Sequence, residues 1–199
     1  MANHDMTLAL IAAGAAIAGG LITGAYQHAR DWFNRPKLRI DSKESAANKV
    51  DSEYKKPDGT TVSEIYIRAR VQNTGRQIAK GCVVSLAKLE KVHPSGRTTS
   101  TVFFDSRPLA WAGWKFLPRD VPSGVDFYVD LMRVSKSVPG WKFSVEKLFG
   151  NEAALQSYWG TYRFSLVVTA DNAKPASCRI DITYNGDWHN LNAVQVPSA

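Results

Sequence analysis

Two hydrophobic patterns divide this chain. The stretch Met6–Tyr26 carries no charged residue, whereas the sequence after it contains short runs in which apolar and polar residues alternate. A helix of about 20 residues rises roughly 30 Å, which is the thickness of the hydrocarbon core of a bilayer. The pattern therefore predicts a single N-terminal transmembrane helix followed by a β-rich domain.

The alternating runs predict strands because side chains of a strand point to opposite faces in turn. The clearest is Ser63–Asn73, where Ile65, Ile67 and Ala69 share one face. A polar loop is expected at 43–56, and a short helix or a loop at 146–157. Further strands are expected at 38–41, 82–92, 98–104, 125–134, 162–170 and 178–184. Several turn-separated strands with almost no helix favour a mainly β, antiparallel sandwich.

Two other interpretations of Met6–Tyr26 remain open. A cleaved signal peptide has Lys or Arg before a shorter apolar core, but no such residue precedes Met6. A buried helix of a soluble domain is the second alternative.

Within the predicted helix, small residues recur every four positions and form a smooth ridge, typical of membrane helices whose backbones approach closely. This ridge predicts self-association or contact with another membrane helix. The alternative is that Ala and Gly are simply common in membrane helices. The residues of the ridge are Ala12, Ala16, Gly20 and Gly24.

Basic and aromatic residues follow the predicted helix, and none of the residues before it is Lys or Arg. The positive-inside rule then favours the cytoplasm over the periplasm for the C-terminal domain of a single-pass inner-membrane protein, with export as the alternative. Membrane lipid is the expected partner of these residues. The predicted membrane-interface residues are Tyr26, Arg30, Trp32, Arg35, Lys37 and Arg39.

The chain is accordingly divided into five parts. They are an N-terminal tail (1–5), the transmembrane helix (6–26), a juxtamembrane basic segment (27–36), the β-sandwich (37–196) and a C-terminal tail (197–199). The net charge of +7 belongs partly to the juxtamembrane segment and is otherwise scattered among acids, so no nucleic-acid partner is expected.

The sequence contains no recognisable catalytic or metal-binding motif. We therefore expect no enzymatic activity, no metal and no cofactor. Asp187 and His189 are close in sequence, but they are a weak dyad candidate. Cys82 and Cys178 both lie in predicted strands, where they either face each other across the sandwich and form a disulfide or remain ordinary buried thiols.

One aromatic cluster is a speculative ligand site. Trp111, Trp114 and Lys115 combine two indole rings with a cation, a set that stacks on sugars, bases or side chains of a partner. The alternative is that both Trp residues fill the core between the sheets. An exposed cluster would indicate a sensor-like domain that binds a small ligand or carbohydrate.

The run from Ile67 to Cys82, with its Asn73-Thr-Gly75 turn, resembles the strand–turn–strand of bacterial CARDB-like and other immunoglobulin-like modules, and the hairpin Tyr162–Tyr184 is similar to their final two strands. The resemblance implies an immunoglobulin-like sandwich. Modules of this kind mostly bind or space other proteins. The expected function is therefore a membrane-anchored interaction or scaffolding module, with a partner protein or a second copy bound through the transmembrane helix.

Overall fold

The structure is a computed structural model of the 199-residue chain. It describes residues 26–27, 30, 32–42, 48–100, 106–113, 116–136, 141–143 and 159–197. The chain divides into two compact units, Met1–Arg35 and Pro36–Ala199, of which the second contains every named strand.

The first sheet is built around the long strand β3 (Thr61–Asn73). One edge of β3 pairs with β8 (Asp126–Ser135), which in turn pairs with β9 (Trp141–Phe143). The other edge is shared by two strands, since β1 (Leu38–Asp41) pairs with the end of β3 and β2 (Lys49–Lys55) with its beginning. All these pairs are antiparallel.

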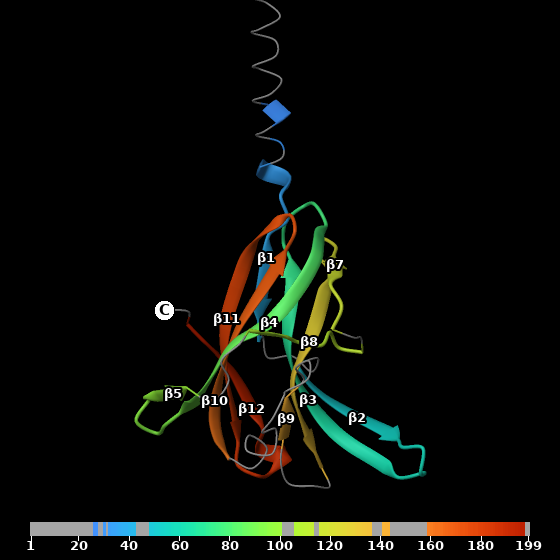
Figure 1. Ribbon diagram of the computed structural model, residues 1–199, viewed down its shortest axis with the longest axis vertical. Coiled ribbons are helices and arrows are strands. Elements are labelled where there is room, and N and C mark those ends of the chain that lie inside the picture. Colours follow the sequence, from blue (N-terminus) through green and yellow to red (C-terminus); the bar gives the residue numbers. More distant parts are fainter. Residues whose placement is uncertain are drawn as a thin grey trace, which may run out of the picture. The chain divides into compact units, whose positions relative to one another are not determined.

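The second sheet has the order β12-β11-β10-β4-β5 (Figure 1). Its long strands are β4 (Ala79–Val92), β10 (Gly160–Ala170) and β11 (Ala173–Tyr184). The outer edge of β4 pairs successively with the short strands β7 (Arg119–Val121), β6 (Arg107–Pro108) and β5 (Thr98–Ser100). The 3₁₀ helix η1 (Trp188–Asn190) leads into β12 (Asn192–Val196).

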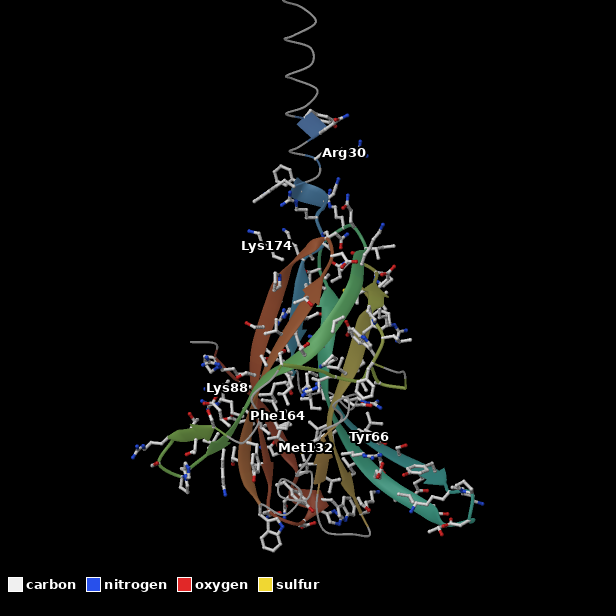
Figure 2. All side chains as sticks on the ribbon, viewed as in Figure 1. Arg30, Tyr66, Lys88, Met132, Phe164 and Lys174 are labelled. Atoms are coloured by element: carbon white, nitrogen blue, oxygen red, sulfur yellow. The ribbon has the colours of Figure 1, made fainter. Side chains whose placement is uncertain are left out.

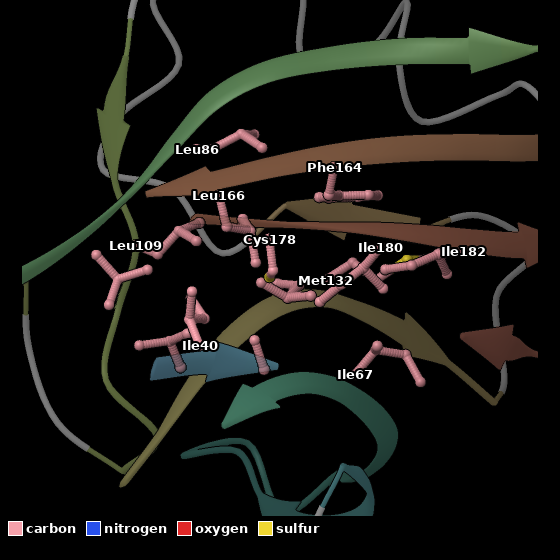
Figure 3. Close-up of a cluster of buried hydrophobic side chains, with 14 of the residues drawn as sticks. Ile40, Ile67, Leu86, Leu109, Met132, Phe164, Leu166, Cys178, Ile180 and Ile182 are labelled. Carbon is pink, nitrogen blue, oxygen red and sulfur yellow. The ribbon is translucent and has the colours of Figure 1, made fainter. Parts of the chain in front are cut away.

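The apolar faces of both sheets meet in one core (Figure 3). Ile67 and Met132 from the first sheet are buried in the same cluster as Phe164 and Ile180 from the second. The segment 107–112 joins the sheets along one side, because the Leu109 N–H donates to the Val84 carbonyl and the Asp130 N–H then donates to the Ala110 carbonyl. The protein is therefore mainly β, with two antiparallel sheets packed as a sandwich.

Most of the sequence-predicted strands are confirmed, and so are the hairpins 82–104 and 162–184 in their described parts. The polar loop predicted at 43–56 is partly wrong, since residues Lys49–Lys55 form β2. This strand has polar residues on both faces, so its sequence lacks the apolar stripe that marks β3. The helix or loop predicted at 146–157 lies outside the described residues.

The predicted transmembrane helix also lies outside the described residues, apart from Tyr26. The same holds for its small-residue ridge, Ala12, Ala16, Gly20 and Gly24. None of the described helical residues belongs to a helix long and apolar enough to cross a membrane.

Candidate interaction surface at the Asn73 end

The side chain of Asn73 organises one end of the sandwich. It is fully buried, and its amide oxygen accepts hydrogen bonds from the backbone N–H groups of Lys37 and Gly75, both at 3.0 Å. Its amide nitrogen donates to the Gln77 carbonyl at 2.6 Å and to the Val121 carbonyl at 3.0 Å. One side chain thus ties the start of β1, the β3–β4 loop and β7 together, and every hydrogen-bonding position of the amide is used.

A second amide joins the β10–β11 turn to the same end. Asn172 accepts a hydrogen bond from the Lys80 N–H and donates to the Ile78 carbonyl, both at 2.9 Å. The Asp171 N–H donates to the Lys80 carbonyl at 3.0 Å. The β3–β4 loop is therefore held from both of its sides.

The β7–β8 turn completes this end, which we call the Asn73 end: Lys37, loop 74–78, turn 122–125 and turn 171–172. The Gly124 N–H donates to the Asn73 carbonyl at 3.0 Å, and the Ser123 hydroxyl donates to the Gly75 carbonyl. The backbone here is fixed by hydrogen bonds between segments that are distant in sequence.

The surface of the Asn73 end combines exposed aliphatic side chains with cations. Ile78 is 47% and Val125 is 44% exposed. Two carboxylates lie close by: Asp120 accepts the Gly81 N–H at 2.9 Å, and Asp171 lies beside the same glycine. Lys80 and Lys174 lie on the strands directly next to this end. Together with exposed residues of the end itself they form what we name the basic loop surface: Lys37, Arg76, Ile78, Lys80, Val125 and Lys174, all exposed. Lys174 is labelled on the β10–β11 hairpin in Figure 2.

Sequence reasoning selected only Lys37 from this surface. The others escaped because Lys174 and Arg76 are far apart in sequence. The structure brings both to Lys37, which forms a parallel bridge with Lys174 and whose carbonyl accepts the Thr74 N–H of the β3–β4 loop at 2.8 Å. A usable signal was present in the segment Arg76-Gln-Ile-Ala-Lys80, where an aliphatic residue stands between two cations directly after the Asn73-Thr-Gly75 turn.

The other predicted membrane-interface residues lie in both units. In the first, Tyr26 and Trp32 are 68% and 55% exposed, Arg30 is exposed, and the Arg35 guanidinium lies 5.1 Å from the centre of the Trp32 ring. In the second, Arg39 lies on β1 and forms an ion pair with Asp41 at 2.9 Å.

Of the speculative ligand cluster, the structure describes Trp111. Trp111 is 2% exposed, and its ring packs edge-to-face against Phe127 at 6.2 Å between ring centres. The physical reason is its position on the segment that joins the sheets, where Trp111 forms a bridge with Val129. Trp114 and Lys115 lie outside the described residues. At position 111 the structure thus agrees with the alternative in which the indole fills the core between the sheets.

The outer face of the first sheet carries paired charges. Arg70 donates from Nε and Nη2 to the two carboxylate oxygens of Asp41, both at 2.9 Å, and Asp41 is 2% exposed. Arg68 pairs with Asp130 at 2.7 Å, yet burial outweighs this guanidinium and raises the pKa of Asp130. Each of these carboxylates has a guanidinium partner. Removing either guanidinium would leave a buried carboxylate without its partner, so the pairs fix the arrangement of the strands and leave neither acid free for chemistry.

Asp187 and His189, the weak dyad candidate, do not form a dyad, because Asp187 is the N-cap of η1. The Asp187 carboxylate accepts the His189 backbone N–H at 3.0 Å and the Asn190 side-chain amide at 2.9 Å, which caps η1. The His189 ring instead stacks on Trp188 at 3.5 Å. Within the described ranges, no group of three or more His, Cys, Asp or Glu side chains is arranged to hold a metal ion.

The two thiols are buried and free. Cys82 lies on β4 and Cys178 on β11, with β10 between them; Leu166 of β10 is aligned with both Cys178 and Leu86. Cys82 is displaced from Leu86 along β4, and two strand spacings separate β4 from β11 in the perpendicular direction. Combined, these two displacements place the cysteines about 16 Å apart, too far for a disulfide. Of the two alternatives, the structure therefore agrees with ordinary buried thiols, since both cysteines belong to the same sheet and do not face each other across the sandwich. Burial raises the pKa of Cys82 to about 11 and that of Cys178 to about 12.

Comparisons with protein-family models, with curated protein sequences and with solved structures each find no match to this chain.

Proposed function

We propose that this protein is a single-pass inner-membrane protein whose immunoglobulin-like sandwich is a non-catalytic interaction module. Residues 6–26 form its transmembrane helix, and the sandwich lies in the cytoplasm. The partner is another protein, or a second copy that associates through the small-residue ridge of the helix.

The observation that carries this proposal is where the chain joins the sandwich. The backbone N–H of Lys37, a residue of the basic loop surface, is bonded to the Asn73 side chain at 3.0 Å. Residues 27–36 connect the proposed membrane helix to that point, and ten residues span at most about 35 Å when fully extended. An anchored chain therefore holds a cationic end of the sandwich within this distance of the lipid.

Membrane fractionation of the full chain tests the anchor. The double variant Leu10→Asp/Ile17→Asp introduces two carboxylates into the proposed span, and each costs about 2.5–3.5 kcal/mol near the centre of a membrane helix. We expect the wild-type chain to stay in the membrane pellet after an alkaline carbonate wash and the variant to move to the supernatant. A matched variant, Thr60→Asp/Ser95→Asp, alters two exposed turns of the sandwich and is expected to stay in the pellet.

A supernatant location of the wild-type chain would contradict the anchor. Compartment-specific reporters fused after Ala199 test the orientation, with activity of the cytoplasmic reporter alone as the expected result. Activity of the periplasmic reporter alone would reverse the orientation and leave the anchor standing.

A further inference from the structure

We propose that the basic loop surface binds anionic phospholipid headgroups, so that the Asn73 end of the sandwich rests on the membrane. This inference rests on the proposed anchor. It adds a second lipid contact, made by loops of the folded domain, to the contact expected of the juxtamembrane segment.

The chemistry of the β3–β4 loop fits a lipid interface. Ile78 is 47% exposed and stands between the exposed cations Arg76 and Lys80. An aliphatic side chain flanked by long cationic ones can enter the boundary between headgroups and acyl chains while the charges stay at phosphate level. Val125, 44% exposed, lies on the neighbouring turn of the same end.

The charges of this end favour an anionic surface. Lys37, Arg76, Lys80 and Lys174 are exposed, and the facing acids are Asp120 and Asp171. Asp126, at the start of β8, is paired with Arg70 and Gln72. Each cation close to an anionic leaflet strengthens membrane binding about fivefold.

The surface is also preorganised. Asn73 holds the loop through Gly75 and Gln77, and Asn172 holds it through Ile78 and Lys80. Because these segments are already fixed, contact with a flat membrane needs little further ordering. The β2–β3 and β4–β5 hairpins lie at the other end of the sandwich and provide control positions (Figure 1).

The test uses the full chain in lipid nanodiscs, with an environment-sensitive fluorophore attached at Ile78→Cys. Ser95→Cys, in the exposed β4–β5 turn, is the matched control. The native cysteines are buried, so labelling under native conditions is selective for the introduced thiol. Discs contain either phosphatidylcholine alone or a mixture with phosphatidylglycerol, and a lipid carrying a headgroup quencher reports proximity.

We expect quenching at position 78 to be at least threefold stronger in the anionic discs than in the neutral ones, with no such difference at position 95. Arg76→Glu/Lys80→Glu should abolish the difference, and Lys55→Glu/Lys56→Glu, in the β2–β3 hairpin, should preserve it. Equal quenching in both lipids, or equal quenching at positions 78 and 95, would overturn the inference while the anchor stands. A chain that does not enter the discs at all would overturn the proposed function as well.

Discussion

The buried amide oxygen of Asn73 accepts the backbone N–H of Lys37 at 3.0 Å, which fixes the point where the chain enters the sandwich. Lys37 directly precedes β1, whose first residue, Leu38, is paired with Asn73 of β3. The same amide also holds Gly75, Gln77 and Val121. Stability of the fold and geometry of the proposed lipid surface therefore depend on one side chain.

Replacing Asn73 by Ala should destabilise the sandwich by about 3 kcal/mol, because buried N–H and carbonyl groups lose their partners without gaining water. Asn73→Asp keeps the shape but turns a donor into an acceptor that faces two carbonyls, so a comparable loss is expected. Urea denaturation followed by tryptophan fluorescence measures both. Arg76→Ala, in the exposed part of the same loop, is the control and should stay within about 0.5 kcal/mol of wild type. Similar midpoints for all three variants would refute this role of Asn73.

Arg70→Ala should cost about 3–5 kcal/mol, since it leaves the Asp41 carboxylate buried without its bidentate partner. Arg70→Lys should recover only part of this, because an ammonium group cannot reproduce the two parallel hydrogen bonds. The matched control is Arg39→Ala, which removes the other cation of Asp41. The Arg39 side chain is 63% exposed, so its loss should cost at most about 1 kcal/mol. Equal losses for Arg70→Ala and Arg39→Ala would show that burial of the pair does not matter.

The buried carboxyl of Asp130 gives a pH-dependent prediction. Burial raises its pKa above 3.8 in the folded state, so its contribution to stability is greatest at low pH and is lost as the pH rises through the raised value. The free energy of unfolding of wild type relative to Asp130→Asn should therefore fall between pH 3 and pH 7.

Glu90 is the matched control of opposite sign. The Lys88 ammonium lowers the pKa of Glu90, so its contribution is present at neutral pH and is lost as the pH falls. Wild type should gain stability relative to Glu90→Gln between pH 3 and pH 7. If the stability of wild type changed in the same direction with pH relative to Asp130→Asn and to Glu90→Gln, burial would not be the dominant cause of the raised pKa of Asp130.

Local pattern was sufficient for the strands whose inner face is continuously apolar. Ile65, Ile67, Ala69 and Val71 alternate in β3 and are all buried, so the sequence reveals both the strand and its core face. β2 has no such stripe, so its sequence does not reveal a strand. Its place in the sheet comes from pairing with β3. Its charged residues are typical of an exposed edge strand, which protects the sheet from pairing with another chain.

The surface at the Asn73 end depended on contacts that no local pattern encodes. The Asn73-Thr-Gly75 turn is recognisable from its residues, but its partners Lys37 and Val121 lie 36 and 48 positions away. Trp111 shows the same limit: whether an indole is buried or exposed depends on the path of segment 107–112 between the sheets, which is set by pairing with β4 and then β8.

The proposed helix ridge predicts a face-specific effect on self-association. Gly20→Leu adds a bulky side chain to the ridge formed with Ala12, Ala16 and Gly24, and should abolish close approach of two helices. Gly19→Leu adds the same side chain one position away, off the ridge, and should leave association unchanged. A membrane-based dimerisation reporter fused to residues 1–36 measures both variants. Equal effects at the two positions would indicate that the glycines do not form a specific contact face.

The two cysteines should behave as slow, independent thiols. With pKa values of about 11 and 12, Cys82 and Cys178 carry little thiolate at pH 8, and both are almost completely shielded from solvent. Alkylation with iodoacetamide at pH 8 should be at least a hundredfold slower in the native protein than in 6 M urea. Mild oxidants should leave both thiols free, because β10 separates the strands that carry them. A thiol count in the native protein, compared with one after unfolding, checks both statements, and an intramolecular disulfide in the folded protein would contradict the strand order of the second sheet.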